Sequence, residues 1–184
     1  FTTAGGTSAD YIAQWDGTSW SSLGAGMNGS TYALVVYDGY LIAGGAFTMA
    51  GGANIRYIAR WDGSSWSAVA AAGEEFNNTV NALAVYDGDL IAGGYFTKIG
   101  TADARRIAVW DGSAWTELGG GAGNAVTELG TYEPVSGTEY LVAAGGGLAL
   151  SLGGDGGVGM YGGTVNVNNS GSIDTQGEYA YGIK

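Results

Sequence analysis

One unit recurs along most of this chain, and its recurrence limits what the chain can fold into. The most complete copy reads Leu41-Ile-Ala-Gly-Gly-Ala-Phe-Thr and continues to Ile58-Ala-Arg-Trp-Asp-Gly-Ser-Ser-Trp66. The same two motifs recur in residues 90–97 and 107–115, and an incomplete copy occupies residues 1–20. Each copy has to form the same small unit, so we expect a repeat protein rather than one irregular domain.

The repeat predicts an all-β chain. Trp15 and Trp61 are 46 residues apart, and Trp61 and Trp110 are 49 residues apart. A period in the forties with several short strands per copy is typical of propeller blades. The 37 glycines and single proline favour many tight turns, and no apolar run keeps a helical period past the next glycine. In the second copy the expected strands are residues 57–61, 65–69, 80–86 and 89–93.

Glycine and aspartate mark the expected turns. Asp-Gly follows an apolar run at Asp38 and Asp87, and Asp-Gly-Ser/Thr follows the first tryptophan of each copy at Asp16, Asp62 and Asp111. Asp-Gly between apolar runs is a strong hairpin signal. Each aspartate stands alone rather than in a spaced carboxylate set, which favours a turn over a calcium site.

The paired glycines of the repeat also have a structural interpretation. Gly44-Gly45 and Gly93-Gly94 each end an apolar strand, where glycine permits a bulge or a close backbone approach. Neither pair has the context of a phosphate-binding loop.

The tryptophans raise the alternative of a stacking site for sugars or bases. The first of each copy alternates with alanine on one strand face, and a second tryptophan recurs five residues later. A large residue that recurs beside a small one favours packing between neighbouring blades. We therefore interpret the whole set as structural signature residues, namely Trp15, Trp20, Trp61, Trp66, Trp110 and Trp115.

One loop is the candidate contact site. The loop before the third strand of the second copy is about three residues longer than its counterpart in the first copy, and it contains Glu74, Glu75 and Phe76. Variable loops on a repeated scaffold are common places for binding. These three residues are the candidate ligand-binding site of the sequence, although an ordinary solvated loop is the favoured interpretation.

Composition excludes several functions. Seventeen acidic residues against six basic ones give a formal charge of −11, which disfavours nucleic acid as a partner. Cysteine and histidine are absent, so we expect no disulfide, no metal site and no cofactor. No segment has the pattern of a membrane span, and we expect no membrane insertion. Because the chain begins within a repeat, we expect it to be part of a longer protein.

The C-terminal part differs in composition, which divides the chain. We expect repeats over residues 1–46, 47–95 and 96–147, followed by a Gly-rich segment over residues 148–184 in which tryptophan disappears. In one interpretation this segment is a degenerate fourth blade, with Val158-Gly-Met-Tyr placed as the Ile-Ala-Arg-Trp strand. The other interpretation, a β-solenoid-like segment, is favoured by the short Val/Ile alternations between Gly and Asn.

The apolar strand ending in Gly-Gly, then Phe-Thr and Ile-Ala-x-Trp-Asp-Gly-x-x-Trp, resembles the kelch-like β-propellers of large secreted and cell-surface proteins. The repeats look closest to those of fungal cortical polarity markers and long bacterial surface proteins. Residues 162–183 are similar to passenger segments of bacterial autotransporter adhesins. These resemblances imply an extracellular or cell-surface structural or adhesive protein. Some kelch-like propellers are copper oxidases, but their ligands include His and Cys, so that activity does not carry over.

Three copies alone would leave sheet edges bare, and four solutions stay open. The tail forms a fourth blade, a longer parent chain supplies blades, copies of the chain assemble, or the repeats close as a threefold β-trefoil. The expected partners are other copies or the rest of a parent chain, or else glycans or cell-surface proteins. The leading hypothesis is a non-enzymatic structural protein that self-assembles through strand edges, and the alternative is a glycan- or peptide-binding propeller module.

Overall fold

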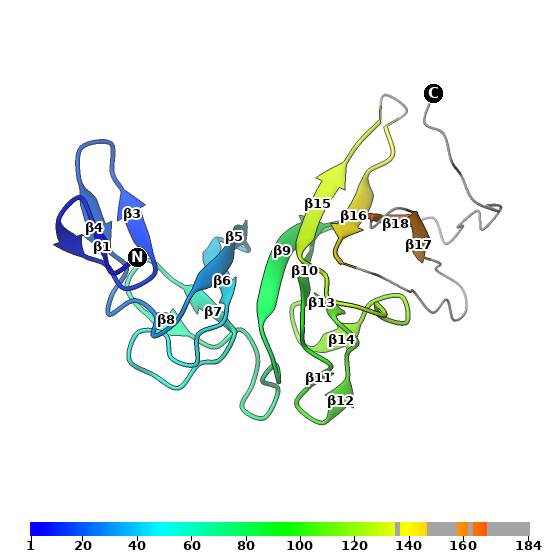
Figure 1. Ribbon diagram of the computed structural model, residues 1–184, viewed down its shortest axis with the longest axis horizontal. Coiled ribbons are helices and arrows are strands. Elements are labelled where there is room, and N and C mark those ends of the chain that lie inside the picture. Colours follow the sequence, from blue (N-terminus) through cyan, green and yellow to red (C-terminus); the bar gives the residue numbers. More distant parts are fainter. Residues whose placement is uncertain (135–136, 147–157, 162–163, 169–184) are drawn as a thin grey trace.

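The computed structural model describes residues 1–134, 137–146, 158–161 and 164–168, the last two ranges by their backbone. Within these ranges the chain forms β-strands and turns without a helix, which confirms the all-β prediction. The sheets are small and antiparallel, and they follow one another along an arc from β1, β3 and β4 at one end to β15–β18 at the other (Figure 1).

Two four-stranded sheets share one strand order. The first sheet has the order β5-β6-β7-β8, with β5 Thr31–Tyr37, β6 Tyr40–Gly45, β7 Ile58–Trp61 and β8 Trp66–Ser67. The second has the corresponding order β9-β10-β13-β14, with β9 Val80–Tyr86, β10 Asp89–Gly94, β13 Ile107–Trp110 and β14 Trp115–Glu117. Each sheet therefore joins the last strand pair of one sequence copy to the first strand pair of the next.

The remaining pairs are short. An isolated two-stranded sheet contains β3 Ala13–Trp15 and β4 Trp20–Ser22, which correspond in sequence to β7 and β8. Two hairpins extend from the loops: β1 Thr3–Ala4 with β2 Thr7–Ser8, and β11 Lys98–Ile99 with β12 Ala102–Asp103. Lys98 and Asp103 close the second hairpin with a 2.7 Å ion pair.

The third four-stranded sheet departs from this order. It runs β15-β16-β18-β17, with β15 Glu128–Tyr132, β16 Tyr140–Ala144, β17 Val158–Tyr161 and β18 Thr164–Asn168. Thr164–Asn168, rather than the segment from Val158, pairs with β16. The Ile-Ala-Arg-Trp strand β7 pairs with β6, so residues 158–161 would have to pair with β16 to match it. They do not, and this alignment is wrong. Most of the segment 148–184 lies outside the described residues.

The turns and glycine pairs agree with their sequence interpretation. Asp38-Gly39 and Asp87-Gly88 have positive φ at both residues, as a type I′ hairpin turn requires. The sheet register shifts next to Gly45 and Gly94, opposite Thr31 and Val80. A Cβ at Gly45 would stand 2.2 Å from the Ser30 carbonyl oxygen, and one at Gly94 would stand 2.1 Å from that of Thr79. The second glycine of each pair is thus fixed by backbone contact at a bulge.

The first glycine of each pair positions the neighbouring sheet. A Cβ on Gly44 would lie 2.8 Å from Val80 Cγ1 and 3.3 Å from Leu83 Cδ1. A Cβ on Gly93 would lie 2.5 Å from Val126 Cγ1 and 3.3 Å from Leu129 Cδ1. We call each of these gaps a glycine notch. The valine and leucine of the following repeat fill it, so sheet-to-sheet packing requires glycine here.

The tryptophans form three cross-strand pairs. Ring centroids lie 5.3–5.6 Å apart in Trp15–Trp20, Trp61–Trp66 and Trp110–Trp115, with similar tilts. Trp66, Trp110 and Trp115 are buried, in agreement with a packing role. The pair between β3 and β4 is the exception, because both of its rings are exposed.

Candidate functional site

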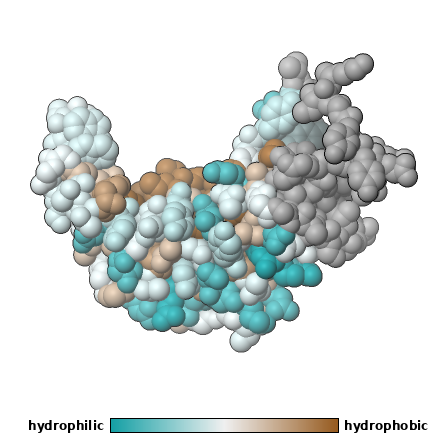
Figure 2. All heavy atoms as spheres, in the orientation of Figure 1, coloured by the Kyte–Doolittle hydropathy of each residue, from teal (hydrophilic) through white to brown (hydrophobic). Residues whose placement is uncertain are grey.

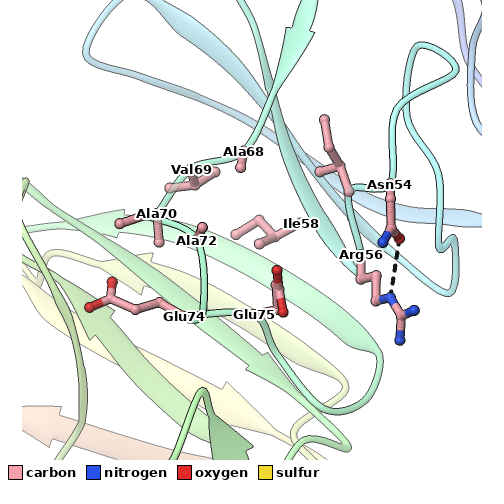
Figure 3. Close-up of a pocket in the computed structure, with 11 residues that line it drawn as sticks. Asn54, Arg56, Ile58, Ala68, Val69, Ala70, Ala72, Glu74 and Glu75 are labelled. Atoms are coloured by element: carbon pink, nitrogen blue, oxygen red, sulfur yellow. Dashed lines mark hydrogen bonds between the residues drawn. The ribbon is translucent and has the colours of Figure 1, made fainter.

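The long loop predicted to bind a ligand borders a small hollow of about 190 Å³. Ile58, Val69 and neighbouring alanines form its apolar wall, while Glu75 and Arg56 stand at its rim. Figure 3 shows Glu75 directed toward Ile58 and Glu74 extending to the other side. The Arg56 Nε donates to Asn54 Oδ1 at 3.2 Å. The hollow is smaller than the roughly 300–1,000 Å³ of typical ligand pockets.

Phe76 does not belong to this surface. Its side chain is 2% exposed and lies edge-on to the rings of Phe96 at 4.7 Å and Trp115 at 5.0 Å. The expectation that Phe76 contacts a ligand does not fit this place, because an apolar ring in the loop was needed to fill the core. The structure brings Glu74 and Glu75 to one hollow and separates Phe76 from both of them.

The Asp-Gly-Ser/Thr turns are held by their own carboxylates. Asp62 Oδ1 accepts from the Ser64 hydroxyl at 2.8 Å and from the backbone N–H groups of Ser64 and Ser65 at 2.7 Å each. Hydrogen bonds from the Ser64 hydroxyl, and then from these N–H groups, hold the pKa of Asp62 well below its usual range. Asp16 and Asp111 have lowered pKa values for the same kind of reason. These carboxylates serve local structure, as the turn interpretation predicts.

A repeated set of asparagine hydrogen bonds, which we call the asparagine clamp, was not predicted from the sequence. Asn28 Oδ1 accepts from the N–H groups of Thr48 and Met49 at 2.8 Å each, and its Nδ2 donates to Thr48 Oγ1 at 2.9 Å. Asn77 repeats this arrangement with Thr97 and Lys98. The threonine of each Phe-Thr motif thus forms hydrogen bonds with an asparagine 20 residues earlier. Only the recurrence of Asn at equivalent loop positions could have signalled the clamp.

An exposed apolar surface lies at the β3/β5 end of the part of the chain that the structure describes. Leu34 is 52% exposed and Val36 is 67% exposed on β5, whereas Leu83, which matches Leu34 on β9, is only 8% exposed. Figure 2 shows a hydrophobic patch on the concave side, over the position of β5 in Figure 1. The difference arises because the first sheet covers the Leu83 face of β9, while no described residue covers the Leu34 face in that way.

A hollow of about 370 Å³ separates this face of β5 from β3. Its lining includes Phe1, Tyr11, Ala13, Trp20, Tyr32 and Leu34, and we call it the end groove. Phe1 is 66% exposed here, although the matching Phe47 and Phe96 are completely buried. The groove is therefore the place where repeat positions that are core residues elsewhere meet solvent.

The other wall of the end groove is an open strand edge. The strands β7 and β13 pair on both sides, with β6 and β8 and with β10 and β14, but β3 pairs with β4 alone. Tyr57 and Arg106, which precede β7 and β13, accept the N–H groups of Gly45 and Gly94 at 2.9 and 3.0 Å. Tyr11 occupies the matching position before β3, with the same positive φ. Among the described residues, no glycine donates to its carbonyl oxygen.

Comparisons with protein-family models, with curated proteins and with solved structures find no match to this chain. None of the residues that the structure describes belongs to a helix long and apolar enough to cross a membrane. The same part of the chain contains no group of three or more acidic side chains placed to hold a metal ion. What the site offers is thus an apolar face beside an open strand edge.

Proposed function

We propose that this chain is a non-enzymatic structural or adhesive repeat protein whose end groove joins it to other chains of the same repeat. The observation that carries the proposal is the exposed face of β5, where Leu34 repeats Leu83, a residue that is buried against the neighbouring sheet. Large exposed apolar patches on a folded protein mark interaction surfaces. An open strand edge beside such a face adds backbone hydrogen bonds to the same contact.

The proposed architecture is an open row of propeller-like blades rather than a trefoil. It is supported by the shared strand order of the first two four-stranded sheets and by their repeated packing through glycine notches. An extracellular or cell-surface location belongs to the proposal through the kelch-like resemblance of the repeats. The formal charge of −11 suits a protein kept soluble by its surface.

The mass of the particle in solution tests this function. Light scattering on a sizing column, with electron microscopy of the same fractions, should find particles larger than one chain, in amounts that rise with concentration. Leu34→Glu should reduce the mass to that of one chain, because it places a charge in the apolar face. Tyr95→Glu, at a side chain that is 51% exposed outside the end groove, should leave the larger particles intact. Single-chain particles at every concentration would refute the proposal.

A further inference from the structure

We infer that the end groove recognises an antiparallel strand pair with glycine, and not alanine, at one defined position. The inference rests on the proposed function and names the partner: a β-hairpin of the chain's own repeat whose second strand reads Leu-Ile-Ala-Gly-Gly. Two structural observations point independently to this partner. One is the apolar face of β5, and the other is the open edge of β3.

The face of β5 determines which side chain the partner must lack. Val80 with Leu83, and Val126 with Leu129, fill the notches at Gly44 and Gly93. Thr31 and Leu34 on β5 occupy the positions that Val80 and Leu83 occupy on β9. The strand pairing shows this, because Thr31 lies opposite Gly45 as Val80 lies opposite Gly94. Leu34 thus corresponds to Leu83 and Leu129, the leucines that pack at the glycine notches. The partner therefore has to provide a glycine against which Leu34 can pack.

The edge of β3 determines the register of the partner. The first notch glycine lies opposite the isoleucine that starts the next strand, in the pairs Gly44–Ile58 and Gly93–Ile107. Ile12 is the matching isoleucine. In this register the next glycine of the partner donates its N–H to the carbonyl oxygen of Tyr11, as Gly45 donates to Tyr57 at 2.9 Å. One strand pair thus contacts both walls of the groove, the apolar face of β5 and the open edge of β3.

The strand pair β15–β16 of the third repeat does not meet these requirements. Ala144 of β16 stands where the notch glycine belongs, since Ala143 pairs with Leu129 as Ala92 pairs with Leu83. The other edge of β16 is already paired with β18. A Cβ at a filled notch comes within 2.5–2.8 Å of the packed valine, so alanine is rejected there.

The test supplies the strand pair to the full chain. A copy of residues 78–95 placed directly before Phe1 keeps the repeat spacing, because Tyr95 precedes Phe96 as the copy would precede Phe1. The melting temperature of this extended chain should exceed that of the natural chain. A Gly93→Val change within the copy should remove the gain, because valine fills the notch that Leu34 needs.

Leu34→Ala tests whether the added strand pair packs against Leu34 or stabilises the chain only by lengthening it. In the natural chain it should shift the melting temperature by little, because Leu34 is exposed. In the extended chain it should lower that temperature by about 5 °C or more, the loss expected for truncating a buried leucine. Leu83→Ala in the natural chain is the matched reference for a leucine already seated in its notch.

Equal effects of Leu34→Ala in the two chains would overturn the inference, as would an extended chain that gains stability equally with glycine and valine. Either result is separable from the proposed function. If the natural chain forms larger particles that Leu34→Glu dissolves, the function stands while the glycine-dependent partner fails. If the natural chain also stays single, both fail.

Discussion

Gly93→Ala should destabilise the protein because the new methyl group enters an occupied notch. It would stand 2.5 Å from Val126 Cγ1, 3.0 Å from Val126 Cβ and 3.3 Å from Leu129 Cδ1. Val126 is completely buried and branched at Cβ, so it has little freedom to retreat. Gly93 lacks positive φ, so the cost is steric rather than torsional. Overpacking of this kind costs about 1–3 kcal/mol, and we expect about 2 kcal/mol for Gly93→Ala.

Thermal unfolding followed by circular dichroism measures this cost. A loss of about 2 kcal/mol should lower the melting temperature by about 4–8 °C in a chain of this size. Gly130→Ala is the matched control, because Gly130 also lies within a strand without positive φ, and a Cβ there would meet nothing within 4 Å. Gly130→Ala should be neutral or stabilising by up to about 1 kcal/mol.

A double mutant tests whether the contact is the cause. Val126→Ala removes Cγ1, the methyl group that the new Cβ would meet at 2.5 Å, so Gly93→Ala should cost about 1 kcal/mol less in that background than in the natural chain. The reasoning would be refuted if Gly93→Ala melted no lower than Gly130→Ala. It would also be refuted if the effects of Gly93→Ala and Val126→Ala added without coupling.

Three further changes test other repeated features. Trp66 Nε1 donates to the Leu23 carbonyl oxygen at 2.8 Å, whereas Trp115 Nε1 is buried without a partner, so Trp66→Phe should cost about 1–2 kcal/mol more than Trp115→Phe in urea unfolding. Asn77→Ala removes a clamp of three hydrogen bonds and should cost about 1–3 kcal/mol, with increased hydrogen exchange confined to the loop that it holds. The lowered pKa of folded Asp62 means that its carboxylate stabilises the fold above the ordinary carboxyl pKa of about 4, and that this stability is lost as pH falls toward the folded value. The melting-temperature difference between natural protein and Asp62→Ala should therefore be largest near neutral pH and shrink below about pH 4; a difference that grew in acid would contradict the hydrogen-bond explanation.

Local geometry was predictable from the sequence because the relevant signals are local. Asp38-Gly39 adopts its hairpin turn, Asp62 caps its own turn, and Gly45 lies at a bulge. Each of these outcomes depends on φ, ψ and bonds within a few residues. Repetition added the strand boundaries, which agree closely over Val80–Tyr86.

The failures concern contacts between distant residues. Phe76 was assigned to a contact surface because its loop varies in length, but its ring packs on Phe96 and Trp115. Composition also could not reveal that Thr164–Asn168 pairs with β16. Strand pairing is a long-range contact, and a stretch of short Val/Asn alternation fits several sheet edges.

The two ends of the described arc differ in a way that gives the repeat a direction. The face of β5 offers Leu34 and Val36 and lacks a notch to receive them, while the matching face at the β15–β16 end carries Glu128 and Ala144. In the first two sheets the residues at these positions are alanine paired with glycine, as in Ala33–Gly44 and Ala82–Gly93. An added carboxylate and an added methyl group make the β15–β16 face a poor receiver for another leucine. If chains join as proposed, further repeats should therefore add at the β3/β5 end rather than at the β15–β16 face.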